Sequence, residues 1–211
     1  MGLIRRRAML AGLGAVGTGV QAAATQNLVF RVMRKGDEIG RHSVTFAGDT
    51  SDLQVAINVD IRVGLGPITL YRYALRATER WRNGVLMEMS GTTNDDGTKD
   101  FVKVLRQGDL LQVEGSAGKP YVAPAKSIAA SHWNRAELAA PMINIQDGAL
   151  LVFKVTPKGS EQVTARGRQV TADHFALTGK ESLDLWYDAA GNWVHLTAIG
   201  RDGSLITYEQ I

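Results

Sequence analysis

Glu79 is the first residue of this sequence whose type and position could support chemistry. In the segment 69–81, apolar and aromatic residues alternate with arginines, and Glu79 falls on the same face as Tyr71 and Tyr73. If that face is interior, the carboxyl group is desolvated and its pKa is raised unless the group is paired. Such a group could anchor a ligand. It could equally be structural, in an ion pair with an arginine or a hydrogen bond from a tyrosine hydroxyl.

The second candidate is His132-Trp133-Asn134, inside the segment 131–148 where the strand pattern stops. A catalytic histidine needs an orienting partner and a nucleophile or water within hydrogen-bond reach, and Ser131 beside it in sequence establishes neither. The structural alternative is that Trp133 fills the interior of a sheet while Asn134 caps a short helical turn. Glu79 and His132 leave a hydrolase or isomerase as one alternative, but we assign no catalytic residue.

The remaining motifs point to no metal and no cofactor. The four histidines lack His-x-x-x-His or a comparable metal-ligand spacing. The sequence also lacks a Gly-x-Ser-x-Gly elbow, a phosphate loop and a dinucleotide fingerprint. We therefore predict neither group and favour a non-catalytic role over an enzymatic one. The histidines are His42, His132, His174 and His195.

The first 24 residues have the pattern of a signal peptide. Arg5-Arg6-Arg7 is followed by a run of small and apolar residues at 8–20 and by Ala22-Ala23-Ala24, a site typical of signal peptidase cleavage. The arrangement around Arg6-Arg7 also resembles the twin-arginine export signal. The apolar run is too short and too rich in glycine to span a bilayer, which takes about 20 apolar residues. We expect a periplasmic or secreted bacterial protein whose single domain covers residues 25–211.

Charge and cysteine content exclude several classes of partner. The chain holds 24 basic and 21 acidic residues, and its first 24 residues contain three arginines and no acid, so the remainder is neutral. A neutral domain lacks the excess of positive charge that binding to nucleic acid or to an anionic membrane requires. The absence of cysteine excludes disulfides, thiolate chemistry and the lipidated cysteine of a lipoprotein anchor.

The elements that must position the candidate residues are strands. Residues 53–63 alternate apolar and polar side chains over eleven positions, which predicts a strand roughly 36 Å long in a strongly twisted sheet. Asn83-Gly84 is a type I′ hairpin signal after residue 81, and we expect Val85, Met87 and Met89 to share one face of the returning strand. Further strands are predicted at 28–33, 39–46, 101–105, 110–113, 150–156, 163–165, 170–177, 183–187, 193–199 and 205–208.

These segments predict an all-β, mainly antiparallel domain. About twelve strands in one sheet must curl, so we expect a strongly curved sheet or a half-open or closed β-barrel. One short helical segment near residues 126–140 interrupts the strands, and Pro141 ends it. We expect this segment to join the two halves of the curled sheet, with Trp133 pointing inward.

Several fragments resemble an exported bacterial family known only as a domain of unknown function. The resemblance spans nearly all of the chain after the signal peptide and implies an envelope protein. The layout is also similar to the curved sheets of periplasmic lipoprotein carriers, a likeness of fold that does not fix function. The fragments are Phe30-Arg31-Val32, Gly36-Asp37-Glu38-Ile39-Gly40-Arg41-His42, Tyr71-Arg72-Tyr73, Glu79-Arg80-Trp81, Asn83-Gly84, His132-Trp133-Asn134, Asn144-Ile145-Gln146, Leu185-Trp186-Tyr187-Asp188 and Gly191-Asn192-Trp193-Val194.

The sequence favours binding of an apolar or lipid-like ligand in the concavity of the curved sheet. Two alternatives remain open: a structural envelope component that binds a protein partner, and the hydrolase or isomerase described above. The structural alternative to ligand binding is a solid core that the same residues fill. The predicted ligand-binding residues are Tyr71, Tyr73, Glu79, Met87, His132, Trp133 and Asn134.

Overall fold

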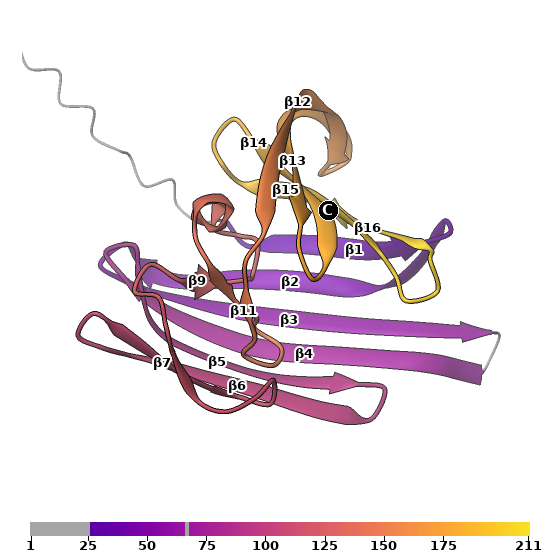
Figure 1. The fold of residues 1–211 in the computed structure, drawn as a ribbon. Helices are drawn as coiled ribbons and strands as arrows, with labels where there is room; N and C mark the ends of the chain where they lie inside the picture. The colour runs from indigo at the N-terminus through magenta and orange to yellow at the C-terminus, as the bar shows by residue number, and fades with distance from the viewer. Residues whose placement is uncertain (1–25, 66–67) are drawn as a thin grey trace, which may run out of the picture.

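The computed structural model describes residues 26–65 and 68–211, and the predicted signal peptide lies outside these residues. The first half of the chain forms an antiparallel meander, which Figure 1 shows as a broad twisted sheet. Its strands are β1 (Leu28–Arg34), β2 (Asp37–Asp49), β3 (Asp52–Leu65), β4 (Ile68–Arg82), β5 (Val85–Asp95), β6 (Thr98–Gln107), β7 (Leu110–Gly115) and β8 (Tyr121–Ala123).

A second meander follows the central segment and continues the same sheet. Its strands are β12 (Lys154–Ala165), β13 (Arg168–Thr178), β14 (Ser182–Asp188), β15 (Trp193–Ile199) and β16 (Leu205–Gln210). The last strand pairs with the first, with Phe30 opposite Gln210, so the described residues form one 13-stranded antiparallel sheet in the order β12-β13-β14-β15-β16-β1-β2-β3-β4-β5-β6-β7-β8.

The sheet is curled but open. The outer strands β12 and β8 lie at opposite ends of the strand order and do not pair with each other. In Figure 1, β12–β16 rise over the concave face of β2–β7, with the central segment between the two layers. This arrangement confirms the prediction of a nearly all-β, strongly curved, half-open sheet.

The central segment forms the predicted interruption. It contains β9 (Ile128–Ala129), the 3₁₀ helix η1 (Arg135–Ala139), β10 (Met142–Ile143) and β11 (Leu150–Leu151), and the three short strands form a small separate sheet. Asn134 caps η1, because its side-chain oxygen accepts a hydrogen bond from the backbone N–H of Ala136. The segment packs closely on the large sheet because Gly91 and Gly115 leave room for its backbone carbonyls.

One strand prediction was wrong. Residues 150–156 do not form a continuous strand, since Leu150–Leu151 pair with β10 in the small sheet and β12 begins only at Lys154. The predicted strand 163–165 is the end of that same long β12, which carries a bulge between Pro157 and Gly159. A proline without an N–H is tolerated at such a bulge on an edge strand.

The long alternating strand is confirmed. Along β3 the residues Val55, Ile57 and Val59 are buried and face the core. The hairpin after β4 also has the predicted form, because both Asn83 and Gly84 adopt positive φ, at 49° and 77°. The core lies between the two layers, where the Phe30 ring packs on the Trp193 ring with centroids 4.0 Å apart.

Candidate functional site

An apolar cavity of about 630 Å³ lies between the two layers of the curled sheet. Strands β2, β3 and β4 form one wall, β14, β15 and β16 form the opposite wall, and residues of the central segment close its inner end. Its apolar and aromatic lining consists of Ile39, Val59, Ile61, Val63, Leu70, Tyr71, Tyr73, Leu75, Ala130, Ile145, Leu183, Leu196, Ala198, Ile199, Ile206 and Tyr208. The volume and lining match those of ordinary small-molecule sites.

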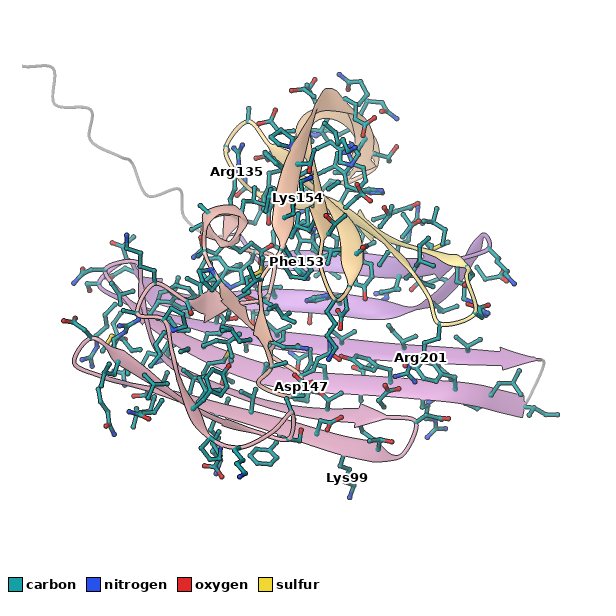
Figure 2. All side chains as sticks on the ribbon, viewed as in Figure 1. Lys99, Arg135, Asp147, Phe153, Lys154 and Arg201 are labelled. Atoms are coloured by element: carbon teal, nitrogen blue, oxygen red, sulfur yellow. The ribbon has the colours of Figure 1, made fainter. Side chains whose placement is uncertain are left out.

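The charged lining residues gather at the mouth of the cavity. Arg34, Glu181, Arg201 and Asp202 lie at or near the strand ends that meet at one edge of the sheet. Figure 2 shows that Arg201, in the β15–β16 turn, lies over β3 and β4. The Arg201 guanidinium forms an ion pair with Asp95 at the end of β5 and so connects the β15–β16 turn with the first meander.

The inner end of the cavity carries polar side chains. His42 from β2 and Ser131 and His132 from the central segment line it. His42 and His132 both pack edge-on against Trp193, with ring centroids 5.1 Å and 5.5 Å from it. Burial, followed by the charge of His132, lowers the pKa of His42 to about 3, so His42 is neutral at physiological pH.

Glu79 lies behind this inner end in a polar cluster with two tryptophans. Its Oε2 accepts hydrogen bonds from Trp81 Nε1 at 2.7 Å and from Trp133 Nε1 at 3.0 Å. The side chain is 3% exposed, and burial raises the pKa of the carboxyl group, as the sequence predicts for an interior position. The partners are two indole groups and the nearby Ser131 hydroxyl, each of which opposes the rise in pKa, where the sequence led us to expect an arginine or a tyrosine hydroxyl.

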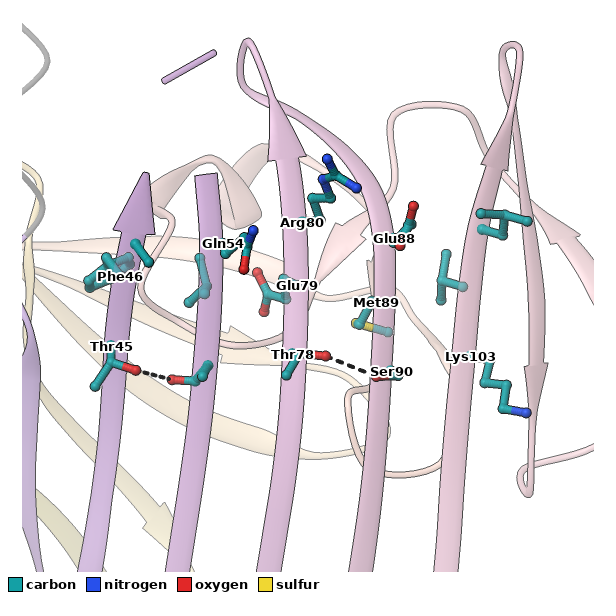
Figure 3. Close-up of a pocket in the computed structure, with 15 residues that line it drawn as sticks. Thr45, Phe46, Gln54, Thr78, Glu79, Arg80, Glu88, Met89, Ser90 and Lys103 are labelled. Atoms are coloured by element: carbon teal, nitrogen blue, oxygen red, sulfur yellow. Dashed lines mark hydrogen bonds between the residues drawn. The ribbon is translucent and has the colours of Figure 1, made fainter. Parts of the chain in front are cut away.

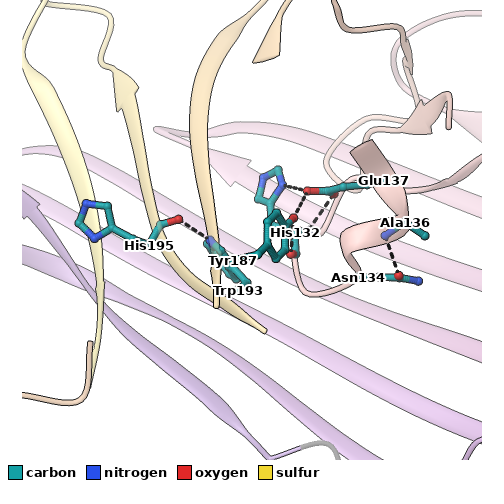
Figure 4. Close-up of polar contacts among 7 residues, drawn as sticks. All are labelled: His132, Asn134, Ala136, Glu137, Tyr187, Trp193 and His195. Carbon is teal, nitrogen blue, oxygen red and sulfur yellow. Dashed lines mark hydrogen bonds and ion pairs between the residues drawn. The ribbon is translucent and has the colours of Figure 1, made fainter. Parts of the chain in front are cut away.

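His132 has an orienting partner in Glu137, as Figure 4 shows. His132 Nδ1 lies 3.0 Å from Glu137 Oε1, and the His132 backbone N–H donates to Glu137 Oε2 at 3.1 Å. Tyr187 donates its hydroxyl to Glu137 Oε1 at 2.8 Å, and burial raises the pKa of Tyr187 well above its ordinary value. This cluster holds His132 at a positive φ of 66°, a conformation that costs energy in a residue other than glycine.

Residues 30–211 match the family model "Domain of unknown function (DUF6134)". The chain belongs to the DUF6134 family. The predicted membership of a family known only as a domain of unknown function is therefore confirmed. No curated protein matches the sequence.

The fold of this DUF6134 domain resembles a solved structure. The crystal structure of a β-barrel-like protein of the domain of unknown function DUF1849 from Brucella abortus superposes with a TM-score of 0.61 at 10% identity, covering 88% of this chain and 94% of that chain. At this level of identity the likeness concerns the fold alone.

The DUF6134 cavity includes only part of the predicted ligand-binding set. Tyr71, Tyr73 and His132 line it, whereas Glu79 and Trp133 lie behind its inner end and Asn134 caps η1. Trp133 packs into the interior against the rings of Trp81 and Phe46, as expected for a residue that fills the sheet.

Met87 is the residue whose placement differs from the prediction. We expected Val85, Met87 and Met89 to share one face, but Leu86 and Met89 are buried and Val85 is 44% exposed. A bulge lies opposite Arg80 and Trp81, where the pairing skips Met87, so the alternation shifts by one residue and Met87 is half-buried outside the cavity lining.

Sequence reasoning missed four residues of this region. Glu137 stands three positions after the cap Asn134, and a capping-box pattern could have drawn attention to it. The alternation along their strands predicts that His42 and Tyr208 point inward, but it does not predict which residues they contact. Tyr187 was quoted only as part of a fragment, yet it is fully buried against Glu137.

A second hollow, of about 790 Å³, lies over strands β2–β6 (Figure 3). Much of this hollow is lined by short side chains on the face of the sheet that is turned away from the cavity. Among them are Thr78 and Ser90, whose hydroxyls lie 2.9 Å apart. Arg80 in this hollow is paired with Asp52. Glu79 also belongs to the lining of this hollow, and we assign no ligand to this surface.

The arrangement offers no complete catalytic set in the described residues. His132 has an orienting carboxyl group, but no described side chain forms a hydrogen bond with His132 Nε2. No group of three or more histidine, cysteine, aspartate or glutamate residues in the described part of the chain could hold a metal ion. No helix within residues 26–65 and 68–211 is long and apolar enough to cross a membrane.

Proposed function

We propose that this protein is an exported envelope protein that binds an apolar or lipid-like small molecule in the cavity between the two layers of its sheet. The observation that carries this proposal is the cavity itself, about 630 Å³ in volume, with a mainly aliphatic and aromatic lining and a few polar groups at each end. Sites of this size and character bury most of the surface of a small ligand. A core packed to ordinary density would leave few voids larger than a water molecule.

The lining supports binding more than chemistry. The sixteen aliphatic and aromatic residues named above provide the surface whose burial drives association, at about 25 cal/mol per Å² of apolar area removed from water. The buried carboxyl group of Glu79 is engaged by two indoles and does not line the cavity. Glu79 therefore contributes by fixing the inner wall, through Trp133.

The test is a titration with the uncharged fluorophore N-phenyl-1-naphthylamine, whose emission rises in apolar surroundings. Ala198→Phe should reduce this rise strongly, because Ala198 lines the cavity between Leu183 and Ile206 and a phenyl group there would project into the space between the two walls. Thr197→Phe is the matched control, since Thr197 points to the other face of the same strand. Equal binding by the wild-type protein and the Ala198→Phe variant would refute the proposal.

A further inference from the structure

The inner end of the cavity contains polar atoms that the protein leaves without partners. His42 Nε2 and Ser131 Oγ are buried and meet no described partner within hydrogen-bond geometry, although the Ser131 hydroxyl lies close enough to Glu79 to lower the pKa of its carboxyl group. His42 is 5% exposed and Ser131 is 1% exposed, and both residues line the cavity. An unsatisfied buried polar group costs about 1–3 kcal/mol, and most such groups in native proteins are paired, so two at one end of one cavity require an explanation.

His132 adds a third polar atom to the same end. Its Nδ1 is engaged by Glu137, while no described side chain forms a hydrogen bond with its Nε2. In the neutral ring whose Nδ1–H donates to the carboxyl group, Nε2 is an acceptor. Ser131 and neutral His42 can each donate as well as accept, so the three residues together suit a group with both capacities.

The charges around the cavity disfavour an ionised group at this end. His42 is neutral, and any charge on His132 is paired with Glu137, whose carboxyl group lies 3.0 Å from His132 Nδ1. The carboxyl group of Glu79 lies behind the inner wall. The arginines of the mouth are also occupied, Arg34 by Asp202 and Ser204 and Arg201 by Asp95. Neither end offers a free cation to a carboxylate or phosphate.

From this geometry we propose that the ligand is an apolar molecule with an uncharged hydroxyl group at the end that enters the cavity first, where His42, Ser131 and His132 bind it. This inference rests on the proposed function and specifies its ligand class. The hydroxyl donates to the free nitrogen of His132 and accepts from Ser131 or His42. The apolar remainder lies between β3 and β15 and extends toward the charged mouth.

Three probes of equal chain length test the inference: decan-1-ol, decane and decanoate, each displacing N-phenyl-1-naphthylamine. We expect decan-1-ol to bind at least about tenfold more tightly than either of the others, which corresponds to about 1.4 kcal/mol. Ser131→Ala and His42→Phe should each reduce the preference for decan-1-ol over decane while the affinity for decane is kept. Thr197→Ala, on the outer face, should leave the preference unchanged.

The outcomes separate this inference from the proposal on which it rests. If the fluorophore and all three probes fail to bind, the proposed function itself is wrong. If decane binds as well as decan-1-ol, if decanoate binds most tightly, or if Ser131→Ala keeps the full preference, the cavity binds apolar molecules but the hydroxyl site is refuted. Thermal unfolding of each variant checks folding, and Ser131→Ala decides the question if His42→Phe does not fold.

Discussion

The carboxyl group of Glu79 lies among indole rings because alternation along β4 turns it inward with Trp81. Burial raises its pKa above the ordinary value of 4.5. The folded protein therefore keeps the proton at pH values where the unfolded chain has lost it. The resulting stabilisation is complete below the ordinary pKa and is lost as the pH rises through the folded-state pKa.

Glu79→Gln should remove this dependence on pH. Glutamine keeps an oxygen for the indole N–H groups and cannot ionise, so the variant should gain stability relative to the wild type as the pH rises. Urea unfolding between about pH 4 and pH 9 measures the difference in the free energy of unfolding. Glu114→Gln, at an exposed position of β7, should show no such trend, and a Glu79→Gln variant that loses stability toward high pH would contradict the assignment.

Tyr187→Phe should destabilise the fold by about 1.5–3 kcal/mol, because it removes a hydrogen bond to the buried carboxyl group of Glu137. Tyr121→Phe is the comparison, since its half-buried hydroxyl donates to the neutral carbonyl of Gly148 at 2.8 Å and should cost only about 0.5–1.5 kcal/mol. Chemical denaturation of both variants measures the two losses. A smaller loss at Tyr187 than at Tyr121 would show that the cluster does not stabilise the protein as described.

The sequence predicts which residues turn inward better than it predicts what they meet. The inward position of Glu79 follows from period-two alternation within one strand. Its partner Trp133 is 54 residues away, and the meeting of Tyr187 with Glu137 spans 50 residues. Such contacts depend on how the central segment packs on the sheet, and local patterns contain no information on that packing.

At the scale of elements, the position of the central segment depends on two glycines of the sheet. A Cβ on Gly91 would lie 2.2 Å from the backbone oxygen of Ile145, and a Cβ on Gly115 would lie 2.2 Å from that of Asp147. Both contacts involve backbone, so a side chain could not be accommodated by a rotamer change. The glycines thus allow the segment that closes the inner end of the cavity to lie directly on β5 and β7.

Gly91→Ala should therefore destabilise the protein by about 2 kcal/mol or more, in the range of overpacked cores. It should also weaken binding of N-phenyl-1-naphthylamine, because Ile145 and Gln146 line the cavity. Gly118→Ala is the control, since a Cβ there meets nothing within 4 Å. Unfolding and binding that match the wild type in Gly91→Ala would mean that the close contact with Ile145 is not maintained.

The elements also show where sequence patterns fail. Alternation predicted β3 and β4 almost to their ends, but the bulge opposite Arg80 and Trp81 moved Leu86 inward in place of Val85. A bulge adds one residue to one strand, and nothing in the residues 85–89 marks it. The break at residues 152–153 is similar, because the apolar run continues while the chain passes from the small sheet to the large one.

For the whole molecule, the decisive pairing is that of β16 with β1, which joins the two meanders and creates the concavity. The class of fold could be predicted from the number of alternating segments. The cavity could not, because its two walls come from strands more than 100 residues apart in sequence. Whether the two layers leave a cavity between them depends on how side chains that are so far apart in sequence pack against each other.

Export is a prediction that concerns the whole chain. Expressed in a bacterium, the protein should appear in the periplasm with the mass expected after removal of about residues 1–24. Replacing Arg6 and Arg7 together by lysine should block export if the twin-arginine route is used. Intact mass measurement of cell fractions gives both results, and a full-length cytoplasmic protein would contradict the signal peptide.

Native mass spectrometry of the protein purified from cells tests the central claim most directly. The wild type should carry an added mass that is released by organic extraction as an apolar compound, or should take one up from a lipid extract. Ala198→Phe should carry none, while Thr197→Phe should match the wild type. A wild-type protein that remains free of any bound compound under both conditions, or an Ala198→Phe variant that binds equally, would contradict the account.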